Sequence, residues 1–409
     1  MKKLVAVIFG ALIVQTPFFS QEQAGDSSVQ FEFKYKKNDR YRILSTVNED
    51  VFINGEKSHH ALIVNRVTAR VTETDETGSG ITECTFMTTE DSTGSRTGAK
   101  FSYGEEYKSV FHRTKNGIYT ISDEYFMPTV RDVPVFPDKK LSPGDKWTAR
   151  GHEAHDLRRI FGLETPYKVP FIAEYEYLGK EEEGNLHVFK VKYNMKMKVP
   201  QNQIPQTEDY PVAMNGFSDE TVFWDLEKGA IDHYSENFRI IMETATGAVL
   251  EFSGTAQAEV TEFERTATEE NLSAIQKKVS DMGIQNVTVS KGEKGLTLSL
   301  EDIKFQADSA ELLDSEKMKL EQIAQILEAW PENDILVTGH TALAGTAKMR
   351  QELSEQRARA VADYMILLGV RDRFHIFTQG FGATKPVAPN TTEEGKARNR
   401  RVEITIMDN

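Results

Sequence analysis

Hydrophobic and polar residues alternate with a period of two along most of the first part of the chain. The clearest run extends from Phe189 to Val199, where apolar residues at odd positions alternate with lysine and asparagine at even positions. This pattern is typical of an antiparallel strand with one buried face and one face in water. Turn sequences such as Asn54-Gly55 separate the runs. We therefore expect residues 29–265 to form an all-β domain, either an antiparallel sandwich or an open barrel.

A group of prolines interrupts this β-rich region at Pro128, Pro134, Pro137 and Pro143. Proline has no backbone N–H to donate to a neighbouring strand, so a central strand is not expected there. Two interpretations follow. The region either divides into two halves near residues 127–143, or this stretch is a long loop that crosses a single domain.

The hydrophobic period changes near Thr268, which can cap a helix with an apolar stripe at Leu272, Ile275, Val279 and Met282. Helical and strand patterns then interleave to the end of the chain. We expect a second domain over residues 268–409, in which two helices lie on one face of a sheet. Within it, Ser354 is expected to start a long helix that ends at Gly369. The whole chain is thus predicted to be an α+β multidomain protein.

The first residues have the pattern of a secretory signal. Two lysines are followed by the apolar run Leu4–Val14, which is too short to span a bilayer, and Ser20 is a small residue before a cleavage point. We expect residues 1–20 to be a signal peptide and residues 21–28, which are mainly polar, to be disordered. The protein is therefore expected to be exported.

Charge limits the classes of partner. The 409 residues carry a formal net charge of −14 and have a pI near 5.3. Such a surface repels nucleic acid and anionic membranes, so no nucleic-acid partner is expected.

No motif in the sequence predicts catalysis or a cofactor. His152-Glu-Ala-His155 has a spacing of three between its histidines, whereas the zinc-binding helix motif needs four. No nucleophile elbow, phosphate loop or dinucleotide fingerprint is present. We expect neither enzymatic activity, nor a metal site, nor a cofactor.

The richest motifs lie in the last third of the chain. They are FQADSAEL from Phe305, ILVTGHTALAGT from Ile335, LSEQRARAV from Leu353, QGFG from Gln379 and NRRVEI from Asn399. In this order and at these spacings they resemble the OmpA-like domain family, over about residues 268–409. The resemblance implies a βαβα sandwich with a further β-hairpin. It also implies non-covalent binding of peptidoglycan through the diamino acid of the stem peptide, diaminopimelate in the family.

The resemblance implies a binding site with an important departure. Thr341 ends the family's TGHT-type motif, and the aspartate that follows it in the family, an acceptor for the ligand, is Ala342 here. The family's asparagine four residues before the LS serine is Arg350, while the arginine of the LSxxRA motif is kept as Arg357. Asn399 and Arg400 belong to a segment that lies by the family's pocket. Because alanine cannot accept a hydrogen bond, binding is expected to be lost, weakened or redirected to another wall group.

Arg357 is the residue on which the binding hypothesis depends. If the helix begins at Ser354, Arg357 lies in its first turn, beside unpaired N–H groups and the positive end of the helix dipole. A cation there is unfavourable for the helix alone but well placed to grip a carboxylate.

The sequence leaves three functional hypotheses. The first is an exported cell-envelope protein that associates with peptidoglycan, with altered or weakened recognition because of Ala342. It would reside in the periplasm or on the periplasmic face of the outer membrane, with outer-membrane or periplasmic proteins as further partners. The second is an envelope scaffold whose OmpA-like domain no longer binds the wall. The third, which we favour least, is an outer-membrane β-barrel in the N-terminal region.

Overall fold

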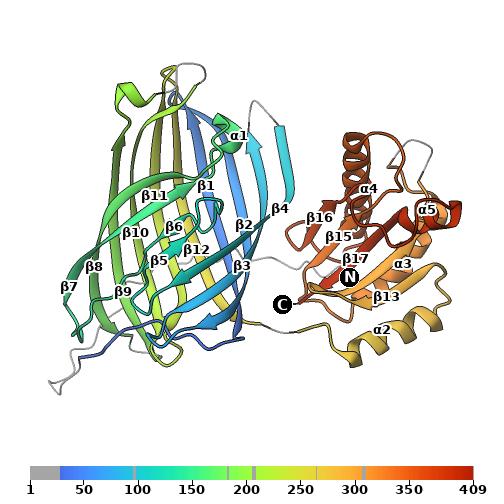
Figure 1. Ribbon diagram of the computed structural model, residues 1–409, viewed down its shortest axis with the longest axis horizontal. Helices are drawn as coiled ribbons and strands as arrows, with labels where there is room; N and C mark the ends of the chain where they lie inside the picture. The colour runs from blue at the N-terminus through green and yellow to red at the C-terminus, as the bar shows by residue number, and fades with distance from the viewer. Residues whose placement is uncertain are drawn as a thin grey trace, which may run out of the picture.

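The computed structural model describes residues 28–408 except 95–97, 182–183, 205–208, 264 and 306–309. The expected signal peptide and all but the last residue of the polar segment 21–28 lie outside the described residues, as do four of the eight residues of FQADSAEL. The chain forms an N-terminal β structure and a smaller C-terminal domain that lies against its side (Figure 1). None of the described helices is long and apolar enough to cross a membrane.

The N-terminal strands form one antiparallel sheet with the order β5-β4-β3-β2-β1-β12-β11-β10-β9-β8-β7-β6. The sheet curls into a nearly closed barrel (Figure 1), so the open-barrel interpretation is right and the sandwich alternative is wrong. The strands are β1 (Arg40–Ile53), β2 (Glu56–Thr74), β3 (Gly80–Gly94), β4 (Gly98–Arg113), β5 (Tyr119–Ile121), β6 (Val130–Arg131), β7 (Lys146–His155), β8 (Tyr167–Lys180), β9 (Leu186–Lys198), β10 (Pro211–Asp225), β11 (Ala230–Thr244) and β12 (Val249–Glu262). A short helix, α1 (Arg158–Phe161), joins β7 to β8, and a 3-10 turn, η1 (Gln201–Gln203), follows β9.

The period of two sets which side chains face into the barrel. On β8 and β9 most buried residues are aromatic or aliphatic, while most alternate positions carry lysine, glutamate or asparagine, with Pro170 and Ile172 as exposed apolar exceptions. The segment before β1 fills one end of the interior. Its Phe31 and Phe33 are buried, and Phe33 and Phe136 each pack edge-on against Trp224 of β10.

The proline-rich stretch 127–143 contributes to this same interior. It contains the short strand β6, and Phe136 and Leu141 from this stretch are buried in the barrel core. The strands before and after it belong to a single sheet.

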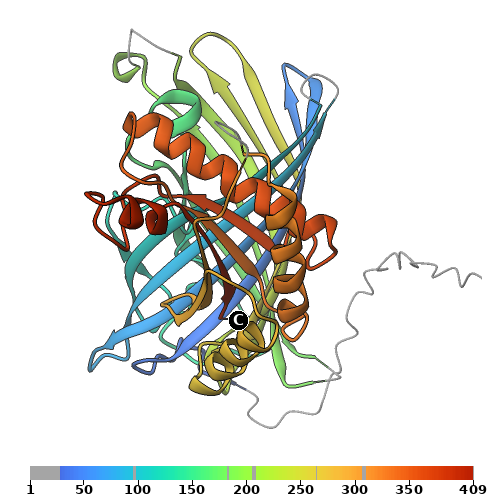
Figure 2. The ribbon, with the colours of Figure 1, turned by 90° about the vertical axis from the view of Figure 1, so that its right-hand side faces the viewer.

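The C-terminal domain is a mixed sheet with the order β13-β14-β17-β15-β16, in which only β15 and β16 are parallel. Its strands are β13 (Val287–Lys291), β14 (Gly295–Glu301), β15 (Ile335–Gly339), β16 (Ile376–Gly380) and β17 (Arg401–Met407). Its helices are α2 (Glu269–Asp281), α3 (Asp314–Leu327), α4 (Ala347–Leu367) and the short α5 (Glu393–Asn399). Seen from the C-terminal side, the helices lie in front of the sheet and the barrel lies behind it (Figure 2).

The long helix α4 begins earlier than the sequence suggested. Thr346 is its N-cap, with a side chain that accepts a hydrogen bond from Met349 N, so the predicted start at Ser354 is wrong. Ser354 instead lies inside the helix, fully buried. Arg357 is therefore in the middle of α4 and not in its first turn, and the argument from the helix dipole does not apply to it.

Candidate functional site

Four of the residues implied by the OmpA-like motifs lie in or against the loops that follow β15 and β16, namely Thr341, Ala342, Arg350 and Asn399. Gly339 and Gly380 are the last residues of these two strands, and both lie directly against Ser354 of α4. A Cβ atom on Gly339 would lie 2.0 Å from the Ser354 carbonyl oxygen, and one on Gly380 would lie 2.6 Å from Ser354 Oγ. Only glycine permits this approach, which brings the N-terminal half of α4 to the ends of the strands.

Hydrogen bonds fix the two loops that follow these strands. Thr341 N donates to Gly382 O at 2.8 Å, and Gly382 N donates to Ser354 Oγ at 2.9 Å. Leu343 N donates to Asn390 Oδ1 at 3.0 Å. The loop after β15 is therefore held by the loop after β16, which is itself bonded to α4 through Ser354.

Asn399 holds the loop after β16 in place through its side chain. It is fully buried, its Oδ1 accepts from Val387 N and Ala388 N, and its Nδ2 donates to Ala388 O and Asn390 Oδ1. Because these bonds occupy its side chain, Asn399 acts on the site by holding the loop that contains Asn390.

Thr341 and Ala342 line the loop after β15 and are both nearly buried, at 7% and 6% exposure. Thr341 Oγ1 has no hydrogen-bond partner among the described residues. The methyl group of Ala342 offers a ligand neither charge nor an acceptor. This part of the site is therefore uncharged.

Arg350 lies in the first turn of α4 together with Lys348, because the helix begins at Ala347. Its guanidinium donates to Gly345 O in the preceding loop. This bond gives Arg350 a role within the protein, since it holds the loop to the helix that follows.

Arg357 lies three residues after Ser354 and so projects from a similar side of α4. It is half-buried, and its guanidinium carbon lies 4.8 Å from the centre of the Phe305 ring. The aromatic face supports the cation and fixes its direction. The structure thus places Arg357 beside the first residue of FQADSAEL, of which residues 306–309 lie outside the described part of the chain.

Arg400 and Arg401 differ in their environments. Arg400 is partly exposed, with Nη2 3.4 Å from Asp302 Oδ1. Arg401 is nearly buried, where Nε donates to Glu403 Oε1 at 2.7 Å and Nη1 donates to Lys385 O at 3.1 Å. Of these two arginines, Arg401 is the one that bonds to the loop after β16.

Glu403 joins Arg401 to His340, the residue before Thr341. His340 is buried, with Nε2 3.5 Å from Glu403 Oε2, and its ring stacks on Phe381. Burial alone would raise the pKa of Glu403, but the bond from His340 and the charge of Arg401 outweigh it and bring this pKa to about 2. Burial lowers the pKa of His340. Sequence reasoning missed Glu403 and Phe381, although Glu403 is one of the polar positions in the alternating run of β17.

Comparison with known proteins identifies the domain. Residues 304–400 match the OmpA family. The chain is 38% identical over 121 residues to "Probable lipoprotein YiaD" of Escherichia coli, covering 29% of this chain and 55% of that protein. It is 40% identical over 104 residues to the peptidoglycan-binding protein ArfA of Mycobacterium tuberculosis, covering 25% of this chain and 32% of that protein. The chain thus spans about a third to a half of the length of these relatives.

Among solved structures, an outer membrane protein from Borrelia burgdorferi is 40% identical, with 30% of this chain and 96% of that chain covered and a TM-score of 0.25. The family match covers residues 304–400, so the N-terminal barrel lies outside it.

Proposed function

Because residues 304–400 form an OmpA-family domain, we propose that this chain is an exported cell-envelope protein that associates non-covalently with peptidoglycan through that domain. The observation that carries the proposal is the position of Arg357. Its guanidinium carbon lies 4.8 Å from the centre of the Phe305 ring, and along α4 it follows Ser354, the residue that contacts the ends of β15 and β16, by three positions. Arginine at such a position suits a carboxylate of a wall peptide.

The loss of the family aspartate is expected to alter what the site recognises. A diamino acid presents an ammonium group beside its carboxylate, and a site that binds both groups needs both charges. Ala342 supplies no acceptor for the ammonium group. We therefore propose that the site binds a diaminopimelate-type peptide more weakly, or that it binds a wall group recognised through its carboxylate and not through an ammonium group.

The location follows from the same proposal. A protein that binds the wall while carrying an expected signal peptide belongs in the periplasm or on the periplasmic face of the outer membrane. The outer surface of the barrel is consistent with an aqueous compartment. Lys190 and Lys192 project outward from β9 and pair with Asp219 on β10, at 2.5 and 2.8 Å. Charged pairs on this face would be costly against lipid, which argues against the outer-membrane barrel alternative.

The envelope scaffold is the second candidate, and Ala342 is the observation that favours it. Without an acceptor, the domain could retain its fold through Ser354, Asn399 and Arg401 while it no longer holds the wall. The two candidates differ in one measurable property, which is whether Arg357 contributes to retention on peptidoglycan.

The test is co-sedimentation of the full chain with purified sacculi. We expect measurable binding that falls at least about tenfold in Arg357→Ala, since a hydrogen bond to a charged group contributes roughly 1.5–3 kcal/mol. Arg359→Ala is the matched control, because Arg359 is an exposed arginine of the same helix. Equal binding by the two variants would remove Arg357 from the site. Absence of binding by the unmodified chain would favour the scaffold.

A further inference from the structure

One face of the C-terminal sheet packs against the helices, and the other packs against the barrel. Ile335 and Val337 of β15 belong to the core beneath the helices, whereas Leu336, between them, points to the opposite side. Leu336 packs there with Phe377 of β16 and with Met87 of β3, and the side chain of Met407 adds to this cluster. The cluster joins residues from both domains, and Phe377 is only 1% exposed within it.

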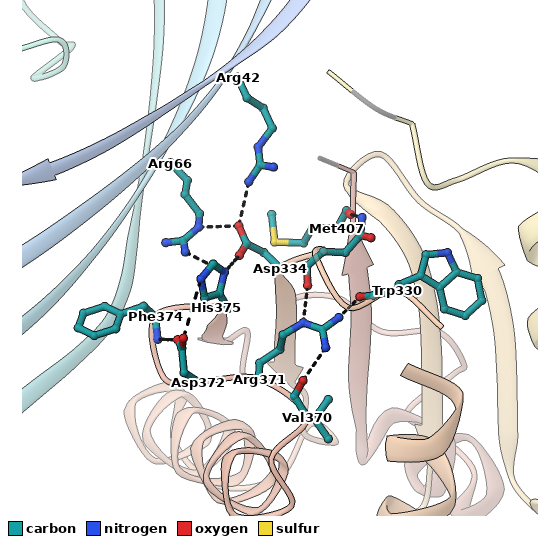
Figure 3. Close-up of polar contacts among 11 residues, drawn as sticks. Arg42, Arg66, Trp330, Asp334, Val370, Arg371, Asp372, Phe374, His375 and Met407 are labelled. Atoms are coloured by element: carbon teal, nitrogen blue, oxygen red, sulfur yellow. Dashed lines mark hydrogen bonds and ion pairs between the residues drawn. The ribbon is translucent and has the colours of Figure 1, made fainter. Parts of the chain in front are cut away.

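A buried carboxylate lies at the edge of this apolar contact. Asp334, which immediately precedes β15, has a side chain that is 3% exposed. Arg66 Nε lies 2.6 Å and Arg42 Nη2 3.0 Å from Asp334 Oδ2, while His375 Nδ1 lies 2.8 Å from Oδ1 (Figure 3). Both arginines come from the outer face of the barrel, on β1 and β2.

Arg66 links the ionic and apolar parts of the contact. Its side chain is only 6% exposed, and its guanidinium carbon lies 5.0 Å from the centre of the Phe377 ring. An arginine on the outer face of a barrel normally lies in water. Here the C-terminal domain supplies both its counter-ion and an aromatic surface, which compensate for the loss of hydration.

Two further ion pairs cross the same contact. Arg373, in the loop before β16, pairs with Asp91 of β3. Lys294, in the turn between β13 and β14, pairs with Glu106 of β4. The contact therefore has an apolar centre, a buried ionic group and outlying charged pairs, as protein–protein interfaces have.

The connection between the domains supports an intramolecular contact. β12 ends at Glu262 and α2 begins at Glu269, so only a short segment separates them. Part of that segment is fixed to the C-terminal domain, because Asp408 Oδ1 accepts hydrogen bonds from Thr266 N and Ala267 N. A short tether keeps the two surfaces at a high effective concentration.

The contact and the candidate wall site lie at opposite ends of the same strands. Asp334 and His375 precede the first residues of β15 and β16, which pair as Ile335 with Ile376. The wall-binding loops follow the last residues, which pair as Gly339 with Gly380. Attachment to the barrel therefore leaves the loops of the candidate site uncovered at the other end.

We propose that the face of the C-terminal sheet opposite the helices is a docking surface for the barrel of the same chain, held by the contacts of Asp334 with Arg42 and Arg66. The two domains then move as one body, and any attachment of the C-terminal domain fixes the orientation of the barrel. This proposal concerns the contact between domains and does not depend on what the candidate site binds.

The test uses the full chain and the oxidation of individual methionines by dilute peroxide, read by mass spectrometry. Met87 is 6% exposed because the C-terminal domain covers it, whereas Met195 lies inside the barrel at 2% and Met318 is 68% exposed on α3. In the unmodified chain, Met318 should react quickly and the other two slowly. Met195 and Met318 thus serve as internal references for a folded protein.

The double variant Arg42→Gln, Arg66→Gln leaves the buried Asp334 without its partners from the barrel. Removal of partners from a buried ion pair is strongly unfavourable, so the population of separated domains should rise on the order of a hundredfold. The oxidation rate of Met87 should rise with it, with Met195 still protected, and small-angle X-ray scattering should give a larger radius of gyration. Arg239→Gln is the matched control, since Arg239 pairs with Glu251 on the barrel away from this contact.

A Met87 rate in the double variant equal to that of Arg239→Gln would overturn the proposal. Oxidation of Met195 would mean that the barrel itself has opened. In that case a second variant decides, Asp334→Asn, which alters the other side of the contact. The proposal then stands only if this variant raises the oxidation rate of Met87 while Met195 stays protected. Sacculus binding separates this proposal from the proposed function. The double variant should bind sacculi as the unmodified chain does, and Arg357→Ala should keep Met87 protected.

Discussion

At the scale of single residues, the site that we propose keeps the arginine implied by the OmpA-like motifs and has Ala342 in place of the implied aspartate. Arg357 keeps the cation and its support from Phe305, while Ala342 leaves the loop after β15 uncharged. Neighbouring groups already have partners within the protein, as Asn399 and Arg401 show. The chemistry of the site thus depends on very few side chains, and its selectivity can be changed at one of them.

Ala342→Asp restores an acceptor at this position. We expect affinity for diaminopimelate-type sacculi to rise roughly 10- to 100-fold, because a hydrogen bond to a charged group contributes about 1.5–3 kcal/mol. Co-sedimentation of the full chain measures the change. Ala342→Asn is the control, since it adds an acceptor without the charge and should give a smaller gain. If neither variant binds more strongly, the site has diverged beyond the loss of one carboxylate.

At the scale of elements, close contact between α4 and the ends of β15 and β16 builds the site. Gly339→Ala should therefore destabilise the C-terminal domain, because the new Cβ atom would meet the carbonyl oxygen of Ser354, a backbone atom that cannot rotate away. Overpacking of this kind costs about 1–3 kcal/mol or more. Thermal unfolding measures the loss. Gly292→Ala is the matched control, since its nearest neighbour would lie 3.6 Å away, and an equal effect of the two changes would contradict the argument.

The elements also show what the sequence could and could not predict. The period of two in Phe189–Val199 predicted the strand β9, because burial of one face follows directly from alternation. The sequence likewise predicted that Thr268 caps α2. The start of α4 could not be predicted from the sequence. Ser354 and Thr346 are both good capping residues, and only the contact of Ser354 with Gly339 and Gly380 shows that Ser354 lies inside the helix.

At the scale of the whole molecule, the sequence could not reveal the contact between the domains. Asp334 lies far along the chain from Arg42 and Arg66, and no local pattern distinguishes these residues from other surface charges. The curvature of the barrel and the packing of the sheet bring them together. The same curvature gathers acidic side chains inside the barrel, which has a consequence for the dependence of stability on pH.

Glutamates on several strands face the barrel interior. Glu220 of β10 lies directly opposite Glu236 of β11, and Ser218 Oγ donates a hydrogen bond of 2.7 Å to Glu236. Glu153 accepts from Tyr193, with His155 2.9 Å away, and Glu49 lies on β1. Burial and then repulsion by Glu236 raise the pKa of Glu220, while burial and a smaller repulsion by Glu153 raise the pKa of Glu236. Burial, with a smaller contribution from Glu90, raises the pKa of Glu49 to about 7.

These raised pKa values predict that stability falls as the pH rises. Between pH 4.5, the ordinary pKa of glutamate, and about pH 7, the folded protein binds more protons at Glu49 than the unfolded chain does. The stabilisation from this protonation is complete below pH 4.5 and is lost by about pH 7. One pKa unit corresponds to about 1.4 kcal/mol, so Glu49 alone changes the free energy of unfolding by up to about 3 kcal/mol.

Urea denaturation of the full chain at pH 5 and pH 8 measures this change. We expect a higher midpoint at pH 5, and Glu49→Gln should reduce the difference because glutamine does not titrate. Glu174→Gln is the matched control, since Glu174 is an exposed glutamate on the outer face of β8. It should leave the difference unchanged. A midpoint that is higher at pH 8, or an equal response of the two variants, would show that the glutamates inside the barrel are hydrated and ionise as they do in the unfolded chain.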